Sequence, residues 1–225
     1  MLKFYFNASP NPSKVALFLE EAGLAYEPIP VDTRKGDQFA PAFAKINPNQ
    51  KVPVIVDGDV TVFDSNAILL YLAEKTGKFL PEEIPAQRGR MLSWLMFVGT
   101  GVGPYSGQAV HFKHHATEPH GYAHDRYQYE ANRHYGIIDA QLKAHHYMLG
   151  KTYTIVDMDL WGWARMLPFI LGDDAFQRFP SIKRLVDEIS ARPAAVKALA
   201  LKDKFTFKAE MDDEARRNMF KHVKA

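Results

Sequence analysis

The sequence predicts an α/β domain with a mixed sheet, in the order βαβαββα, followed by an all-α domain. Strand and helix patterns alternate over the first eighty residues, and a strand–helix–strand start indicates a parallel strand pair. Two apolar runs joined by Asp57-Gly58 indicate an antiparallel hairpin. Beyond Arg88 every periodic segment is helical. We therefore place the domains at residues 1–80 and 87–225, with a linker at about residues 78–88.

Local signals bound the elements of the α/β domain. Gly23 and Gly77 are the residue type that ends helices in a left-handed conformation, and Asn47-Pro48-Asn49 interrupts any regular element. Asp64-Ser65-Asn66 offers capping side chains to a following helix. The expected strands are residues 2–6, 26–31, 52–56 and 59–63, and the expected helices are residues 15–22, 39–46 and 64–76.

The all-α domain carries one clear helix start. Thr154-Ile155-Val156-Asp157 resembles a capping box, with Asp in place of Glu or Gln. The residues from 205 onward are charged and are expected to form a peripheral tail or helix. The expected helices are residues 87–98, 122–146, 156–171, 182–190 and 194–199.

Composition excludes several classes of function. The 225 residues are 47% hydrophobic and 24% charged, as in an ordinary globular protein, and a net charge of +2 gives no reason to expect nucleic acid as a partner. No apolar run is long enough to span a membrane and no signal peptide is visible, so we expect a cytoplasmic protein. The absence of cysteine excludes disulfides, thiolate metal sites and a cysteine nucleophile, so the sulfur for any thiol chemistry must come from a ligand.

Four stretches together resemble the cytosolic glutathione transferases, in the order and spacing of that family. They are SKVALFLEE at residues 13–21, NPNQKVP at 47–53, DSNAILLYL at 64–72 and YTIVDMD at 153–159. Ser9-Pro10-Asn11, the loop at residues 35–39 and Arg126-Tyr127 are similar to the bacterial nu class, which is related to fungal Ure2-like proteins.

The resemblance implies a thioredoxin-like N-terminal domain that binds glutathione, an all-α C-terminal domain and a homodimer. It further implies an enzyme that uses bound glutathione as a thiolate co-substrate, without a tightly bound cofactor, and that reduces glutathione disulfides. Conjugation of glutathione to electrophiles is the alternative activity. A non-catalytic binding module on the same fold is the other alternative, although such a module would not need the polar residues described next.

By the same resemblance, Pro53 follows a cis peptide bond that turns the Val52 backbone toward the cysteinyl amide of glutathione; a trans edge proline is the alternative. Asp64 and Ser65 would hold the γ-glutamyl end, since a helix N-terminus suits a carboxylate. Both could also be simple helix caps.

Gln38 and Lys51 are the candidates for the glycyl carboxylate, which a lysine matches as a point charge. The alternative is that both are solvated loop residues.

Ser9 and Asn11 are the candidates for stabilising the thiolate, with Tyr5 as the fallback. Lowering a thiol pKa by two units takes about 2.7 kcal/mol. One charge-assisted hydrogen bond gives about 1.5–3 kcal/mol and the N-terminus of the following helix adds about 0.3–1 kcal/mol, so no general base is required.

Arg126 is the candidate for the second-substrate pocket, where it would bind the carboxylate of a second glutathione moiety; a surface salt bridge is the alternative. His111, His114 and His115 fall at helical spacing, which could offer two imidazoles to a metal. No accompanying carboxylate or HExxH pattern exists, so we predict solvated histidines and no metal site.

Overall fold

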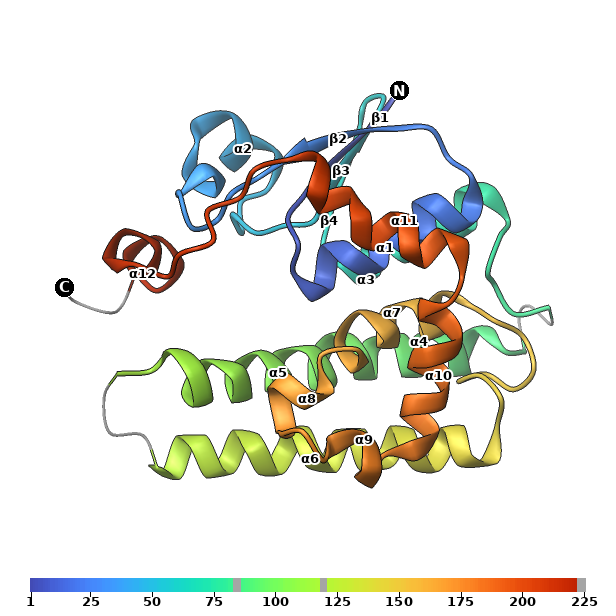
Figure 1. Cartoon of the computed structure of the whole chain (residues 1–225). Coiled ribbons are helices and arrows are strands. Elements are labelled where there is room, and N and C mark those ends of the chain that lie inside the picture. Colours follow the sequence, from blue (N-terminus) through green and yellow to red (C-terminus); the bar gives the residue numbers. More distant parts are fainter. Residues whose placement is uncertain (83–85, 118–120, 222–225) are drawn as a thin grey trace. The chain divides into compact units, whose positions relative to one another are not determined.

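The computed structural model describes residues 1–82, 86–117 and 121–221 (Figure 1). Its contacts divide the chain into two compact units, Met1–Leu72 with Pro193–Ala225, and Ala73–Arg192. Residues 83–85 of the expected linker lie outside the described residues. The division of the chain at residues 78–88 stays a prediction.

The first unit is built on a four-stranded mixed sheet in the order β2-β1-β3-β4. β1 pairs parallel with β2 and antiparallel with β3, and β3 pairs antiparallel with β4. The predicted order βαβαββα is thus confirmed. The bounds are β1 Leu2–Phe6, α1 Pro10–Ala22, β2 Tyr26–Pro30, α2 Pro41–Ile46, β3 Val54–Asp57, β4 Val60–Phe63, α3 Ser65–Thr76, α11 Pro193–Ala200 and α12 Asp213–Met219, with 3-10 turns at Asp37–Phe39 and Leu201–Lys204.

Both faces of this sheet are covered (Figure 1). Residues of β1 alternate, so that Phe4 is buried on the face covered by α1 and α3. Tyr5 points to the other face, where its ring meets that of Phe43 in α2 at 5.8 Å. Val31, Phe43 and Val54 form the buried cluster on the α2 side. Helices thus pack on both faces of the sheet and fix its strands in place. The polar loops start from the ends of these strands (Figure 1).

The second unit is helical throughout its described elements. Its longest helix, α6, packs against α5 and α10. The predicted capping box is confirmed: Asp157 Oδ2 accepts from the Thr154 backbone N–H at 2.9 Å, while the Thr154 hydroxyl caps α7. The bounds are α4 Arg88–Phe97, α5 Gly103–Val110, α6 Gly121–Ala144, α7 Ile155–Ala164, α8 Leu167–Leu171, α9 Ala175–Arg178 and α10 Pro180–Ser190, with π-helical segments at Val98–Val102 and His111–His115.

Proline accounts for three differences from the expected elements. α1 begins at Pro10, because a proline at the first helical position lacks only an N–H that would be unpaired anyway. β3 begins at Val54, because Pro53 has no N–H to donate to the sheet. The helix expected over residues 156–171 is two helices, since Pro168 cannot donate to a carbonyl one turn earlier.

Candidate active site

The turn before β3 presents an unpaired stretch of backbone. The Val52–Pro53 peptide bond is cis, as predicted. Among the described residues, the N–H and C=O of Val52 have no hydrogen-bond partner. Backbone groups in folded proteins are nearly always paired, so an extended ligand that brings one donor and one acceptor fits here.

Asn47 holds this turn in place. It is buried, its amide Nδ2 donates to the Lys51 carbonyl at 2.6 Å, and its Oδ1 accepts from the Asn49 N–H at 2.9 Å. The sequence predicts Asn47-Pro48-Asn49 as the end of a helix and as part of a family-like stretch, but it gives Asn47 no role of its own. An asparagine that bonds its own backbone two residues on is the usual signature of such a turn.

The start of α3 lies beside the same turn. Asp64 Oδ1 accepts from the N–H groups of Asn66 and Ala67, at 2.9 and 3.2 Å, so Asp64 caps this helix. Ser65 is buried, and its hydroxyl lies 3.4 Å from Asn66 Oδ1. That Oδ1 also accepts from the buried Lys14 ammonium at 2.9 Å. A helix N-terminus with a cation beneath it favours a carboxylate ligand.

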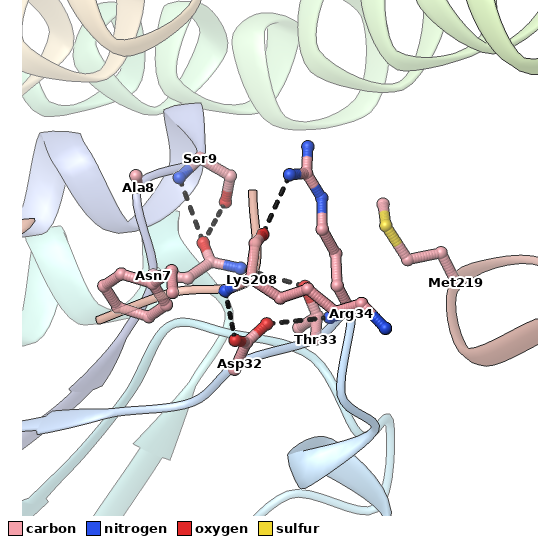
Figure 2. Close-up of a pocket in the computed structure, with 9 residues that line it drawn as sticks. Asn7, Ala8, Ser9, Asp32, Thr33, Arg34, Lys208 and Met219 are labelled. Carbon is pink, nitrogen blue, oxygen red and sulfur yellow. Dashed lines mark hydrogen bonds between the residues drawn. The ribbon is translucent and has the colours of Figure 1, made fainter. Parts of the chain in front are cut away.

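The residues expected at the sulfur end lie at the start of α1. Ser9 precedes the helix, but its side chain makes no capping bond to it. Instead its hydroxyl donates to Asn7 Oδ1 at 2.6 Å, and its N–H donates to the same oxygen at 3.0 Å (Figure 2). Asn11 lies in the first turn of the helix. Tyr5, the fallback, packs on Phe43 instead.

Gln38 lies in the 3-10 turn and is 5% exposed. Its Nε2 donates to the carbonyls of Thr33 and Asn218, each at 3.3 Å. Its Oε1 is buried without a partner among the described residues. Because two carbonyls surround Nε2, the orientation of the amide is settled. A carboxylate could reach this amide nitrogen only after the Asn218 carbonyl had left it.

Two neighbouring cavities bring these residues together. The first measures about 460 Å³, which suits a small molecule. The second measures about 180 Å³ and shares Asn11, Asn49, Lys51 and Val52 with the first. Of the predicted site residues, the first cavity gathers Ser9, Asn11, Gln38, Lys51 and Val52, and the second gathers Asn11, Lys51, Val52, Pro53, Asp64 and Ser65.

The C-terminal tail closes one side of the first cavity. The wall formed by the tail consists of Asn218, Met219, Phe220 and Lys221. The Asn218 amide donates to the Arg34 carbonyl at 2.9 Å, and the Lys221 ammonium lies 3.4 Å from the centre of the Phe39 ring. Sequence reasoning placed no tail residue in the site.

Ser9 also lines a third cavity, of about 270 Å³, whose lining residues are drawn in Figure 2. Here the tail is fixed to the loop after β2. The Lys208 N–H donates to Asp32 at 2.6 Å, and the Arg34 guanidinium donates to the Lys208 carbonyl at 2.9 Å. Phe207 meets Phe6 edge-on at 5.9 Å. The tail is therefore packed along the first unit before it reaches the larger cavity.

Arg126 belongs to the second unit, on α6. It is exposed and forms no ion pair or hydrogen bond within the described residues, because the nearby Glu130 is paired with Arg133 at 2.9 Å. The surface salt bridge that was the alternative is thus absent from the described part of the chain. Next to it in sequence, Tyr127 stacks on Phe112 at 5.4 Å.

The histidines of residues 111–115 serve other contacts. His114 Nε2 lies 2.9 Å from the Phe169 carbonyl, and its ring stacks on Phe169 at 4.1 Å. In the described parts of the chain, no three His, Asp or Glu side chains gather as a metal site would require. Nor is any helix there long and apolar enough to cross a bilayer.

Known proteins resemble this chain over nearly its whole length. A model of the glutathione S-transferase N-terminal domain matches residues 2–74, and one of the C-terminal domain matches residues 108–200. The chain is 40% identical over 221 residues to the disulfide-bond oxidoreductase YfcG of Escherichia coli K12, covering 95% of this chain and 98% of that protein. The chain therefore belongs to the glutathione S-transferase family.

Solved structures agree with this assignment. A glutathione transferase family member from Pseudomonas fluorescens, with two glutathione bound, has a TM-score of 0.83 and 35% identity over 88% of this chain and 92% of its own. A glutathione transferase from Pseudomonas putida, with one glutathione disulfide bound per subunit, has a TM-score of 0.83 and 36% identity over 89% and 91%. The predicted thioredoxin-like domain followed by an all-α domain is confirmed.

Proposed function

We propose that this protein binds glutathione along the two joined cavities and uses its thiolate to reduce disulfides. One observation carries the proposal: the unpaired Val52 backbone lines both cavities together with Lys51, and Ser65 at the start of α3 lines the smaller one. Glutathione has a matching order of groups, with a γ-glutamyl carboxylate, a cysteinyl amide and a glycyl carboxylate. Asp64, whose Oδ2 has no partner among the described residues, would receive the γ-glutamyl ammonium.

Ser9 and Asn11 would then lie at the sulfur. Pro10 and Pro12 lack N–H groups, so the first turn of α1 offers fewer backbone donors than an ordinary helix start. The side chains of Ser9 and Asn11 must therefore supply most of the stabilisation. One charge-assisted hydrogen bond contributes about 1.5–3 kcal/mol, enough to lower a thiol pKa by about one to two units.

The disulfide step needs no protein cysteine, and the chain has none. The bound glutathione thiolate attacks a mixed disulfide R–S–S–G, forming glutathione disulfide and releasing R–S⁻. The released thiolate takes up a proton equivalent to the one lost by glutathione. The attacking thiolate supplies the electron pair of the new S–S bond, and the electron pair of the broken S–S bond leaves on the sulfur of R–S⁻. Arg126 would hold the carboxylate of the second glutathionyl group, since its guanidinium is not otherwise paired in the described residues.

We further propose a cytoplasmic homodimer that has no nucleic acid partner, no membrane association and no tightly bound cofactor. The disulfide bound to the Pseudomonas putida relative and the name of the Escherichia coli relative support reduction over conjugation. Glutathione acts as co-substrate in either reaction.

The test is turnover of hydroxyethyl disulfide with glutathione, measured against the uncatalysed rate. Ser9→Ala should raise the pH at which activity appears, because less thiolate is then present at a given pH. Arg126→Ala should raise KM for a glutathionylated substrate. Arg133→Ala is the matched control on the same helix, and it should leave KM unchanged because Arg133 is already paired with Glu130. An enzyme that conjugates electrophiles yet shows no disulfide turnover above background would contradict the proposal.

A further inference from the structure

The hydroxyl of Ser9 has a single proton, and in this structure that proton is already used. The hydroxyl lies 2.6 Å from Asn7 Oδ1, a short hydrogen bond (Figure 2). Ser9 also lines the larger cavity, beside Asn11 and Val52. With its proton directed to Asn7, the Ser9 oxygen presents lone pairs to that cavity. It can accept from a thiol but cannot donate to a thiolate.

The direction of this hydrogen bond is fixed by its neighbours. The backbone N–H of Ser9 can only donate, and it lies 3.0 Å from the same atom of Asn7. That atom must therefore be the amide oxygen. The amide nitrogen of Asn7 donates to the Thr33 hydroxyl at 3.2 Å, so this assignment also gives the nitrogen an acceptor. Because Asn7 Oδ1 is an acceptor only, the Ser9 hydroxyl must be the donor between them.

We propose that Asn7 is a positioning residue that controls the orientation of the Ser9 hydroxyl and thereby opposes ionisation of the bound glutathione thiol. The proposal rests on the proposed function, in which Ser9 stabilises the thiolate. When the thiol loses its proton, Ser9 must turn its own proton from Asn7 to the sulfur. Asn7 Oδ1 keeps the Ser9 N–H as a partner, so the turn leaves no buried acceptor unpaired.

Opposing the ionisation of the thiol can favour disulfide exchange. The nucleophilicity of a thiolate falls as the pKa of its thiol falls, and thiol–disulfide exchange is fastest when that pKa lies near the ambient pH. A Ser9 hydroxyl free to donate at all times would lower the thiol pKa further. Asn7 limits that lowering and so retains nucleophilicity in the bound thiolate.

The experiment titrates bound glutathione through the ultraviolet absorbance of its thiolate, on the full chain saturated with glutathione. Asn7→Ala should raise the ionisation constant of the thiol about tenfold, because Ser9 then donates to sulfur without a competitor. Asn7→Asp should lower the constant, because a carboxylate holds the Ser9 proton more strongly and adds a negative charge. In the Ser9→Ala background, Asn7→Ala should have no effect.

Opposite shifts from two substitutions at one position separate this role from a structural one, which would move both the same way. If Asn7→Ala leaves the constant unchanged or lowers it, while Ser9→Ala lowers it, the role of Asn7 is overturned and that of Ser9 stands. If Ser9→Ala also has no effect on bound glutathione, both roles are overturned. If the wild type does not bind glutathione at all, the proposed function itself is contradicted.

Discussion

Ser65 is the residue whose role is most sharply separated from the stability of the fold. It occupies the first position of α3, and the helix is capped by Asp64, not by Ser65. We expect Ser65→Ala to weaken glutathione binding by about 1.5–3 kcal/mol, or about ten- to hundredfold in Kd, because one donor to a carboxylate is lost. Isothermal titration calorimetry measures this change.

The control for this substitution is Ser93→Ala, which removes an exposed helical hydroxyl whose one hydrogen bond within the described residues is to the Gly89 carbonyl. It should leave the affinity unchanged. If Ser65→Ala instead lowers the melting temperature strongly while the folded protein binds glutathione normally, Ser65 is structural and its assigned role is wrong.

At the residue scale, the sequence predicted candidate residues that lie within short recognisable stretches of the chain. Pro53 and Ser65 lie in short stretches typical of the family, and both line the smaller cavity. Asn7 carries no such signal, because its partner Thr33 lies in another loop, 26 residues away. Gln38 was placed near the site, but the tail carbonyl that holds its amide could not be foreseen from its loop alone.

At the scale of one element, the capping box of α7 makes the stability of the fold depend on pH through the Asp157 carboxyl. Asp157 is fully buried, and desolvation raises the pKa of its carboxyl to about 6, although N–H groups of Met148 and Thr154 donate to it. The unfolded value is about 3.9. The folded state therefore binds this proton more tightly, and the contribution to stability is greatest below about pH 4 and declines as the pH rises toward 6.

The prediction concerns the difference in unfolding free energy between the wild type and Asp157→Asn, which cannot titrate. This difference should fall by at most about 3 kcal/mol as the pH rises from about 4 to 6. Urea unfolding at a series of pH values measures it, and titration of other groups cancels in the subtraction. A difference that stays flat or increases with pH would show that the donors hold the pKa of Asp157 at or below its ordinary value.

The tail helix α12 makes a second element-scale prediction. Truncation after Glu210 removes one wall of the larger cavity and the Asn218 carbonyl that holds Gln38, while Phe205 and Phe207 remain packed on Phe6. We expect glutathione both to associate and to dissociate faster, because the wall that restricts access to the cavity is gone. Dissociation should be about fivefold to tenfold faster, which corresponds to the loss of about one hydrogen bond. Stopped-flow binding measures both rates, and unchanged rates would show that α12 does not border the bound ligand.

Elements with a strong apolar period were predicted well, and those defined by long-range packing were not. Residues 2–6 were predicted with the bounds of β1. The short helices α5 and α9 were not predicted. The glycines before Pro104 weaken the helical pattern at the start of α5, and α9 has only four residues. α12 has almost no apolar stripe of its own, and its anchors at Arg34 and Gln38 lie some 180 residues earlier in the chain.

At the scale of the whole molecule, the proposed homodimer makes a simple prediction. Two-fold dimers are the commonest oligomers of soluble proteins. Multi-angle light scattering should give a mass near twice the 25.5 kDa of one chain, at all concentrations above the dissociation constant. A mass near that of a single chain at high concentration would refute the dimer.

The most direct measurement is a crystal structure of the protein soaked with glutathione. The account predicts the γ-glutamyl carboxylate at Ser65, the cysteinyl amide paired with the Val52 backbone, and the sulfur within hydrogen-bond distance of Ser9 or Asn11. Electron density for glutathione outside the two joined cavities would contradict the assigned site. So would glutathione in those cavities with its sulfur turned away from both Ser9 and Asn11.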